Sequence, residues 1–422
     1  MISDAALGRL LPASAVRLYG DLIRALAGVA LFLVWAGFAQ VYLRMIRLTL
    51  TDPSNSDFTI FYFTARMVAD GLPMYGESPA RYGIAWAADH LGNLNPPHFQ
   101  ILTWPFRWLS YGQALLLWVA VNAAGLALAV RMAVGELAIP VTLRRVVLLG
   151  GATLAAAPFT TVAVTSEMTF LLMVPFTAGW IAWRRGRWGR AGAWLGVCVS
   201  LKLFLLLLVP WLAWRRHWRA LGAMAGTAAA LVALGALVFG VEPYRQWTET
   251  LGRVGWWWLP MNASWEGLVS RLLAGSARVA PLVPGPAIVK PLALAGGAAI
   301  CAATLWAARQ SDGTVRRRDL ALLALFAGAI LASPLGWVYY LPLAWGPALA
   351  WLQVGAADTD KVSGHSGSWT HAALLAGLAL LYVPQEIASA AQPSSLATVT
   401  LASAYFWGTA LLWLLLIRDL RR

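Results

Sequence analysis

The chain has 422 residues, of which 60% are hydrophobic and only 12% are charged. Apolar runs of roughly 17 to 25 residues recur along it, the length that crosses a ~30 Å hydrocarbon layer, which excludes a soluble globular protein. The net charge of +14 does not indicate nucleic acid as a partner, because Lys and Arg stand in short clusters between apolar runs, as orientation signals do. We therefore expect an all-α, polytopic integral membrane protein of about 12 membrane segments, folded as a single domain over residues 1–422.

The first predicted span covers residues 24–46. Three arginines stand before or at its start, so the positive-inside rule places the N-terminus in the cytoplasm. The roughly 21 residues before the span are of mixed character and do not resemble a cleavable signal peptide. Residues 47–111 then form a first external loop. Within it, aromatic-rich patches at 57–70 and 79–91 are expected to be helices that lie along the membrane interface.

A conflict between two basic clusters predicts a broken segment in the middle of the chain. Ordinary spans are predicted before it at 112–131, 146–163 and 167–183. Basic clusters follow at 184–187 and 215–219, with about one span length of apolar sequence between them. Because both clusters favour the cytoplasm, we expect a re-entrant pair, 191–200 and 201–213, bent near Lys202. The bend would place Lys202 inside the protein.

The second half of the chain alternates in the same way. Span 219–240 leads out to a second external segment, residues 241–286. Further spans are predicted at 287–308, 319–333, 338–353, 370–386 and 398–417. The last span ends at C-terminal arginines, which places this terminus in the cytoplasm as well. These signals predict a multi-pass protein of the cell membrane.

Unusual polar residues gather on the predicted external side, whereas the cytoplasmic side carries mostly arginine. The external set is Asp57, Tyr62, Arg66, Tyr75, Asn95, His98, Glu167, Asn262, Arg271 and Tyr339. This asymmetry favours an active site that faces outside. The sequence has no phosphate-binding glycine loop, no His-Glu-x-x-His metal motif and no nucleophile elbow, so nucleotide-driven transport and hydrolase functions lack support.

Several of these residues have a structural interpretation beside the functional one. Asp57 is either a helix N-cap or a catalytic base, although the Ser and Asn residues before it offer alternative caps. Lys202, embedded among leucines, must find an anion, either a structural partner such as Glu167 or a substrate phosphate. Arg66 is either a site cation or a charge that reaches the surface from an interfacial helix. His98 is more readily explained as a solvent-exposed interfacial residue.

Several short motifs follow one another along the chain: Ser56-Asp57-Phe58 with Phe61-Tyr62, Ala65-Arg66, Gly71 and Tyr75; Asn95-Pro96-Pro97-His98-Phe99 with Pro105-Phe106; Leu117-Trp118 with Asn122; Leu201-Lys202 before 215–219; and Asn262-Ala263-Ser264 with Arg271. Their pattern resembles glycosyltransferase family 87, membrane enzymes of the GT-C type. Three positions depart from the family pattern. Leu203 stands in place of Pro, Ser166-Glu167 in place of Gly-Gln, and Tyr339-Tyr340 where mannosyltransferase members carry His. Because of the last departure, the family pattern does not identify the donor sugar or the acceptor of this chain.

The resemblance implies a GT-C-like bundle that transfers a sugar, often mannose, from a polyprenyl-phosphate carrier to a lipid or glycan acceptor outside the membrane, with inversion at the anomeric carbon. Asp57 would be the base, because an inverting displacement needs a carboxylate to take the acceptor proton. Lys202, Arg271 or Arg66 would bind the donor phosphate, so no metal or other cofactor is expected. We assign substrate contacts to Tyr62, Tyr75, His98, Asn262 and Tyr339, although the two tyrosines of the first loop also suit interfacial anchors. The alternatives are a transporter or flippase for a lipid-linked or anionic substrate, with Lys202 and Glu167 as a substrate or relay pair, and a non-catalytic assembly subunit.

Overall fold

The computed structural model describes residues 56–75, 92–276, 279–310, 313–359, 365–390 and 395–422, together with parts of 28–51. These residues form helices and no extended strand. The α-helices are α3 (Asp57–Ala69), α4 (Gln100–Thr103), α5 (Tyr111–Glu136), α6 (Leu143–Ala155), α7 (Ala157–Thr165), α8 (Thr169–Arg184), α9 (Trp188–Leu201), α10 (Leu208–Trp214), α11 (Trp218–Phe239), α12 (Glu242–Gly252), α13 (Trp265–Leu273), α14 (Val289–Ala307), α15 (Val315–Ala332), α16 (Trp345–Thr359), α17 (His365–Leu380), α18 (Gln385–Ala390), α19 (Ser395–Val399) and α20 (Ala404–Arg421). The 3₁₀ segments are η3 (Pro97–Phe99), η4 (Trp104–Trp108), η5 (Leu203–Leu207), η6 (Pro286–Ile288), η7 (Ala308–Gln310), η8 (Val338–Ala344) and η9 (Leu401–Ser403).

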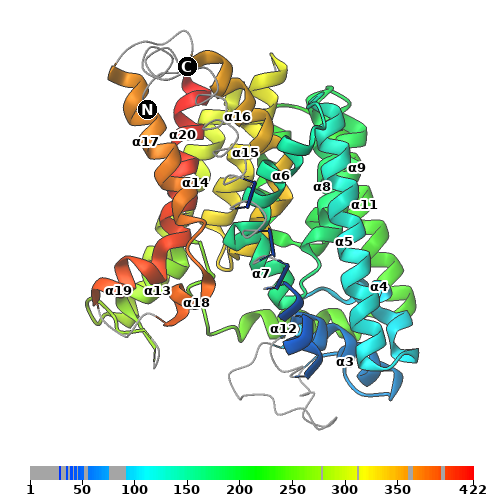
Figure 1. Cartoon of the computed structure of the whole chain (residues 1–422). Helices are drawn as coiled ribbons and strands as arrows, with labels where there is room; N and C mark the ends of the chain where they lie inside the picture. The colour runs from blue at the N-terminus through cyan, green and yellow to red at the C-terminus, as the bar shows by residue number, and fades with distance from the viewer. Residues whose placement is uncertain are drawn as a thin grey trace.

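The long helices form two groups that meet along η8 and α15. Figure 1 shows α5, α8, α9 and α11 side by side in one group and α14, α15, α17 and α20 in the other. Small residues allow the closest contacts, as is usual between membrane helices. A Cβ atom at Gly192 of α9 would clash with the carbonyl of Ala220 in α11. The 3₁₀ segment η8 packs against α7 and α8, and α15 packs against α8 and η5, so the two groups are joined near the middle of the molecule.

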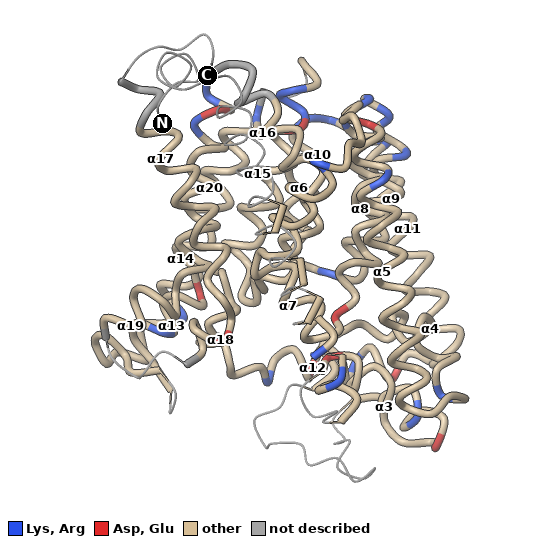
Figure 2. The backbone as a smooth tube through the Cα atoms, viewed as in Figure 1, with Lys and Arg blue, Asp and Glu red and all other residues tan. Residues whose placement is uncertain are grey.

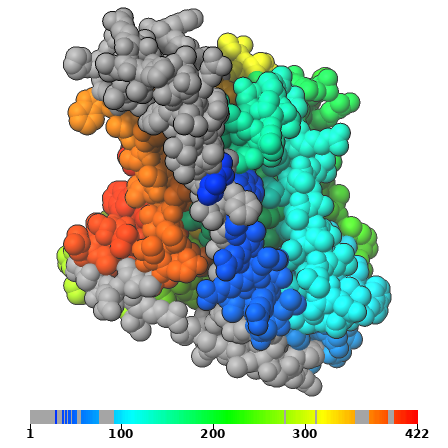
Figure 3. Space-filling model, viewed as in Figure 1, coloured from blue at the N-terminus to red at the C-terminus, as the bar shows by residue number. Residues whose placement is uncertain are grey.

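The described part of the N-terminal region packs on α6. Figure 3 shows these residues, in blue, between α5 in cyan and α17 in orange. The indole Nε1 of Trp35 donates to the carbonyl of Val147 at 3.3 Å, and the hydroxyl of Tyr42 donates to the carbonyl of Leu154 at 3.0 Å. Most of the first predicted span and all of the predicted helical patch 79–91 lie outside the described residues.

Four of the described helices are long and apolar enough to cross a membrane, or five if the bent pair α6–α7 counts as one span. The predicted count of about 12 segments is therefore not confirmed. Part of the difference is that several predicted spans are short or broken helices. For example, α8 has 16 residues and α16 has 15, fewer than the ~20 that a full span needs. The pair α6–α7 bends by 66° at Ala156, two residues before Pro158, which fixes the local backbone.

The predicted break near Lys202 is confirmed. Helix α9 ends at Leu201, Lys202 adopts an extended conformation, and the chain returns through η5 and α10. The two outer ends of this hairpin meet, because the Trp188 ring at the start of α9 stacks on His217 after α10 with centroids 3.7 Å apart. The two basic clusters therefore lie at the same end of the molecule, as their shared preference for one side of a membrane predicts.

Helix α3 lies at the other end of the molecule, near α12 (Figure 1). Eight of its 13 side chains are buried, and Phe58, Phe61 and Tyr62 belong to the main hydrophobic core. The helix is thus a packed element rather than the surface-lying helix that its aromatic content predicted. Its aromatic rings contact Phe106 and Trp118, which follow in the chain, so the loop that was predicted to be external is folded against α5.

The charge distribution predicts which end faces the cytoplasm. In Figure 2, Lys and Arg gather at the end that holds the termini of α8 and α10, whereas acidic and basic residues mix near α3 and α12. We expect an impermeant thiol reagent to label Thr248→Cys of α12 in intact cells, and to label Gly313→Cys only after permeabilisation. Both positions are exposed, and a Cys301→Ala background would remove the partly exposed native thiol. The reverse labelling pattern would contradict the proposed orientation.

Candidate active site

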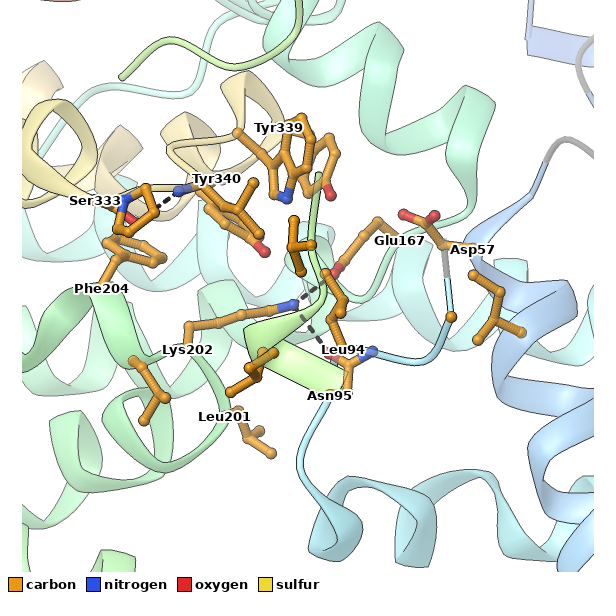
Figure 4. Close-up of a pocket in the computed structure, with 18 of the residues that line it drawn as sticks. Asp57, Leu94, Asn95, Glu167, Leu201, Lys202, Phe204, Ser333, Tyr339 and Tyr340 are labelled. Carbon is orange, nitrogen blue, oxygen red and sulfur yellow. Dashed lines mark hydrogen bonds and ion pairs between the residues drawn. The ribbon is translucent and has the colours of Figure 1, made fainter. Parts of the chain in front are cut away.

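One cavity of about 290 Å³ lies where the two helix groups and the first external loop meet. Its polar lining comes from segments far apart in the sequence: Asp57, Asn95, Glu167, Lys202, Ser333, Tyr339 and Tyr340. Figure 4 shows the Lys202 side chain pointing toward Glu167 and Asn95, with Asp57 beyond Glu167 and the two tyrosines along another wall. The remaining lining is mostly aliphatic and aromatic, as in many small-molecule sites.

Asp57 is the first residue of α3, but it does not cap the helix. The Ser56 side chain is the N-cap and accepts a hydrogen bond from the amide of Phe58 at 3.2 Å. No described residue donates a hydrogen bond to the Asp57 carboxylate, which lines the cavity half-buried. Loss of solvation in the cavity and, to a smaller extent, the negative charge of Glu167 outweigh the opposing effect of Lys202 and together raise the pKa of Asp57 to about 7. A carboxyl with such a pKa can exchange a proton near neutral pH.

Lys202 stands at the break between α9 and η5, where its side chain is buried. Its ammonium lies 2.7 Å from Oε1 of Glu167 and 3.1 Å from Oδ1 of Asn95. The same nitrogen lies 4.9 Å from the centre of the Tyr340 ring. The structural partner considered from the sequence is therefore present, and the cation still lines the cavity. The break in the helix is what brings the ammonium to this position.

Glu167 occupies a turn between α7 and α8 that also holds the start of α3. Ser166 has a left-handed backbone (φ 52°), which reverses the chain there. Ser56 Oγ donates to the carbonyl of Thr165 at 3.1 Å, and Trp118 Nε1 donates to the carbonyl of Ser166 at 2.7 Å. One turn thus holds both Ser56, the residue before Asp57, and Glu167, the partner of Lys202. This turn sets the position of the Asp57 carboxylate relative to the Lys202 ammonium.

Asn262 orders the wall that carries Tyr339 and Tyr340, although it does not line the cavity. It is fully buried, and its Nδ2 donates to the carbonyls of Trp257 and Pro334 at 3.0 and 2.9 Å. Its Oδ1 accepts from the amide of Gly336 at 3.0 Å. A side chain that satisfies this many buried backbone groups holds the segment after α12 against the turn before η8.

Arg271, Arg66 and Tyr62 also lie away from the cavity lining. Arg271 is fully buried; its Nη1 donates to the carbonyls of Leu259 and Asn262 at 3.0 and 3.1 Å, and its Nε donates to Ser403. These bonds support the loop that carries Asn262. Arg66 Nη1 donates to the hydroxyl of Tyr62 at 3.3 Å, and that hydroxyl donates to the backbone carbonyl of Leu109 at 2.8 Å.

Tyr75 and His98 lie behind the cavity wall. The hydroxyl of Tyr75 donates to the backbone carbonyl of Asn95 at 2.5 Å, so it supports a residue that contacts Lys202. His98 was expected at a solvent-exposed interface, but its exposed fraction is 5%. Its Nδ1 lies 3.2 Å from the hydroxyl of Tyr244, and burial lowers its pKa to about 4. The ring is buried because η3 packs against α11.

Several lining residues were not identified from the sequence as site residues. They are Glu167, Asn95, Phe204, Trp247, Trp257 and Trp337. Glu167 had been considered as an ionic partner of Lys202, and Asn95 as part of a family motif, but neither was assigned to the glycosyltransferase site. No site role was predicted for the tryptophans, yet Trp247 of the amphipathic α12 donates to the carbonyl of Leu94 at 2.9 Å and lines the cavity. A signal was present, because tryptophans cluster in both predicted external segments.

Comparison with known proteins gives a family match and several relatives. The model of glycosyltransferase family 87 matches residues 93–334. The chain is 29% identical over 280 residues to a polyprenol-phosphate-mannose-dependent alpha-(1-2)-phosphatidylinositol pentamannoside mannosyltransferase of Mycobacterium tuberculosis, covering 62% of this chain and 58% of the relative. A protein of the same name from Mycolicibacterium smegmatis is 30% identical over 157 residues, 36% of each chain.

A third relative matches more of the chain. It is a polyprenol-phosphate-mannose-dependent alpha-(1-2)-phosphatidylinositol mannoside mannosyltransferase of M. tuberculosis, 28% identical over 339 residues, which are 75% of this chain and 72% of the relative. The matched region thus spans little more than half the length of the first relative and about a third of the second. No solved structure matches the chain significantly.

Proposed function

The chain belongs to glycosyltransferase family 87, and from this premise we propose that it transfers a sugar from a polyprenyl-phosphate carrier to a lipid or glycan acceptor, with inversion at the anomeric carbon. The three relatives are named as polyprenol-phosphate-mannose-dependent mannosyltransferases, which supports a carrier of this type. The reaction would take place at the end of the molecule that carries α3, on the outer side of the cell membrane.

The proposed chemistry needs one base and one fixed cation. The acceptor hydroxyl oxygen bonds to the anomeric carbon while the bond from that carbon to the phosphate oxygen breaks. The acceptor proton passes to the Asp57 carboxylate, and the electron pair leaves with the polyprenyl phosphate. Lys202 faces the phosphate as its negative charge grows, which stabilises the transition state in a site of low dielectric constant. In this proposal no step requires a metal ion or another cofactor.

The observation that carries the proposal is the meeting of Asp57 and Lys202 in one cavity. The two residues come from segments 145 positions apart, and both line the same cavity. Asp57 has no capping role, because Ser56 performs it. The transporter alternative gains no support from the comparisons, since the three relatives are all named as mannosyltransferases. A non-catalytic assembly subunit would tolerate the loss of Asp57.

A direct test is to incubate purified protein in membranes with a panel of radiolabelled polyprenyl-phosphate sugars and with lipid extracts as acceptors. Transfer from one donor would establish the class of reaction and the sugar together. The panel must extend beyond mannose, because Tyr339 and Tyr340 replace the His that the family resemblance leads one to expect. Import of the intact lipid-linked donor without any glycoside product would instead support the transporter alternative.

The pH dependence of the reaction gives a separate prediction. Only the deprotonated carboxylate accepts a proton, so kcat/KM is expected to rise with pH through a midpoint near 7. The titratable and charged residues that line the same cavity as Asp57 are Glu167, Lys202, Tyr339 and Tyr340.

The stability of the protein should fall, rather than rise, with increasing pH. Since the folded-state pKa is raised from 3.8 to about 7, the contribution of Asp57 to the unfolding free energy is present below about pH 4 and is lost as pH rises through 7.

Measurements of kcat/KM and of thermal unfolding over pH 5 to about 9 would check the expected rise in activity and the expected fall in stability. An activity profile that is flat across neutrality, in a protein that stays folded, would contradict the assignment of the base.

A further inference from the structure

A second cavity lies away from Asp57, between α5, α6 and α16. It is an apolar groove of about 960 Å³. One wall is the face of α5 from Ala123 to Gly135, the other is the face of α6 from Arg145 to Leu154, and Trp345 of α16 completes the lining. At 1.5 Å per residue the α5 wall is about 18 Å long, a little more than half of a ~30 Å hydrocarbon layer. The groove therefore matches one leaflet of a bilayer in length.

Two arginines line the same end of this groove. Arg131 lies in the last turns of α5 and Arg145 in the first turn of α6, and both are exposed. No described carboxylate forms an ion pair with either of them. Glu136, the closest acidic residue in the sequence, is held instead by Arg184 and Arg185 at 3.5 and 2.5 Å. The groove thus combines apolar walls with two cations that lack an anionic partner within the described protein.

The remaining polar groups of the groove are already satisfied. The indole Nε1 of Trp345 donates to Oγ1 of Thr153 at 3.1 Å, so the hydrogen-bonding groups of both side chains are engaged with each other. The described N-terminal residues pack on α6 through Trp35 and Tyr42, whose polar atoms bond to backbone carbonyls of that helix. Nη1 of Arg145 donates to the carbonyl of Pro140 at 3.4 Å. Within the described structure, the remaining N–H groups of the two guanidiniums are the main polar features available to a ligand.

In a bilayer such a groove must be filled. If the groove were empty, the side chains of its walls would lose dispersion contacts. Its apolar part offers no polar groups that could hold ordered water. A lipid chain fills the apolar part. Basic pockets between membrane helices on the cytoplasmic side bind anionic headgroups. We propose that the groove binds an anionic phospholipid of the leaflet at the basic end, with one acyl chain between α5 and α6 and its phosphate at Arg131 and Arg145.

The test uses the full-length protein in detergent, titrated with phosphatidylglycerol or phosphatidylcholine and followed by native mass spectrometry and thermal unfolding. Phosphatidylglycerol is expected to bind and to raise the unfolding temperature more than phosphatidylcholine. At about 1 kcal/mol per basic residue, the Arg131→Gln/Arg145→Gln double variant should bind phosphatidylglycerol about 30-fold more weakly. The control Arg144→Gln/Arg219→Gln removes the same charge from arginines outside the groove and should bind as the wild type does.

A second variant tests the apolar half of the site. Ala127→Phe fills the α5 wall and leaves both arginines in place, so it should also lose the bound lipid. Equal binding of the two lipids, equal loss in both arginine double variants, or the same thermal shift with inorganic phosphate alone would each overturn the proposal. None of these outcomes depends on whether the protein transfers a sugar.

Discussion

Asp57→Asn is expected to lower the turnover of sugar transfer by roughly 10²-fold or more, because the amide cannot take the acceptor proton. The fold should persist. Ser56, not Asp57, caps α3, and asparagine has nearly the same size and is accepted at helix starts. Donor binding should also persist, since the carboxylate contacts the acceptor in the proposed mechanism. The measurement is kcat with the donor identified by the panel, together with thermal unfolding and donor affinity of the variant.

The matched control is Asp70→Asn. Asp70 follows the other end of the same helix, is exposed and does not line the cavity. Its replacement should change turnover by no more than a factor of a few. If Asp57→Asn retained near-normal turnover, Asp57 would leave the mechanism, and the transporter and assembly-subunit alternatives would gain weight.

Lys202→Met is expected to have two separable effects. The first is on stability, because Glu167 would stay buried without its ionic partner, which typically costs about 3 to 5 kcal/mol. The second is on the donor. Loss of a charge-assisted hydrogen bond to the phosphate should weaken donor use by about 1.5 to 3 kcal/mol. The double variant Lys202→Met/Glu167→Gln removes both charges and should recover most of the stability while donor use stays weak.

Unfolding free energies and the apparent affinity for the donor, measured for the single and double variants, separate these effects. A well-folded double variant with normal donor affinity would show that the Lys202–Glu167 pair is only structural. A single variant as stable as the wild type would show that Glu167 is solvated in the absence of Lys202, contrary to its 3% exposed fraction.

Charge patterning predicted the backbone near Lys202 well. Two basic clusters that favour the same side left too little apolar sequence for two spans, and a broken hairpin is the physical resolution. Helices α5, α11 and α14 also follow from continuous apolar runs. The number of spans could not be derived in this way, because α6–α7 and η8–α16 are apolar runs interrupted by proline or by tight turns, and hydropathy does not distinguish a bent segment from a straight one.

The candidate site was predictable only in part. Asp57 and Lys202 were identifiable because an ionisable residue in an apolar environment costs free energy and is therefore a candidate for a functional site. Arg271 and Asn262 have the same sequence signature, yet the structure places them behind the cavity, where they bond to backbone carbonyls. Which buried polar residue faces the cavity and which one supports its wall depends on tertiary packing between segments more than 70 residues apart. Local sequence does not indicate whether such a side chain faces the cavity or supports the wall behind it.

The wide separation of the cavity walls has a consequence for biosynthesis. Asp57 is made early, but the wall formed by Tyr339 and Tyr340 and held by Asn262 requires about four-fifths of the 422 residues to have left the ribosome. Contacts at such sequence separation form late, because a long loop must close first. A nascent chain that has inserted only its first helix group therefore has Asp57 and the Lys202–Glu167 pair but lacks the wall that encloses them. Carrier lipids in the same membrane would meet no assembled reaction centre until the second group has docked.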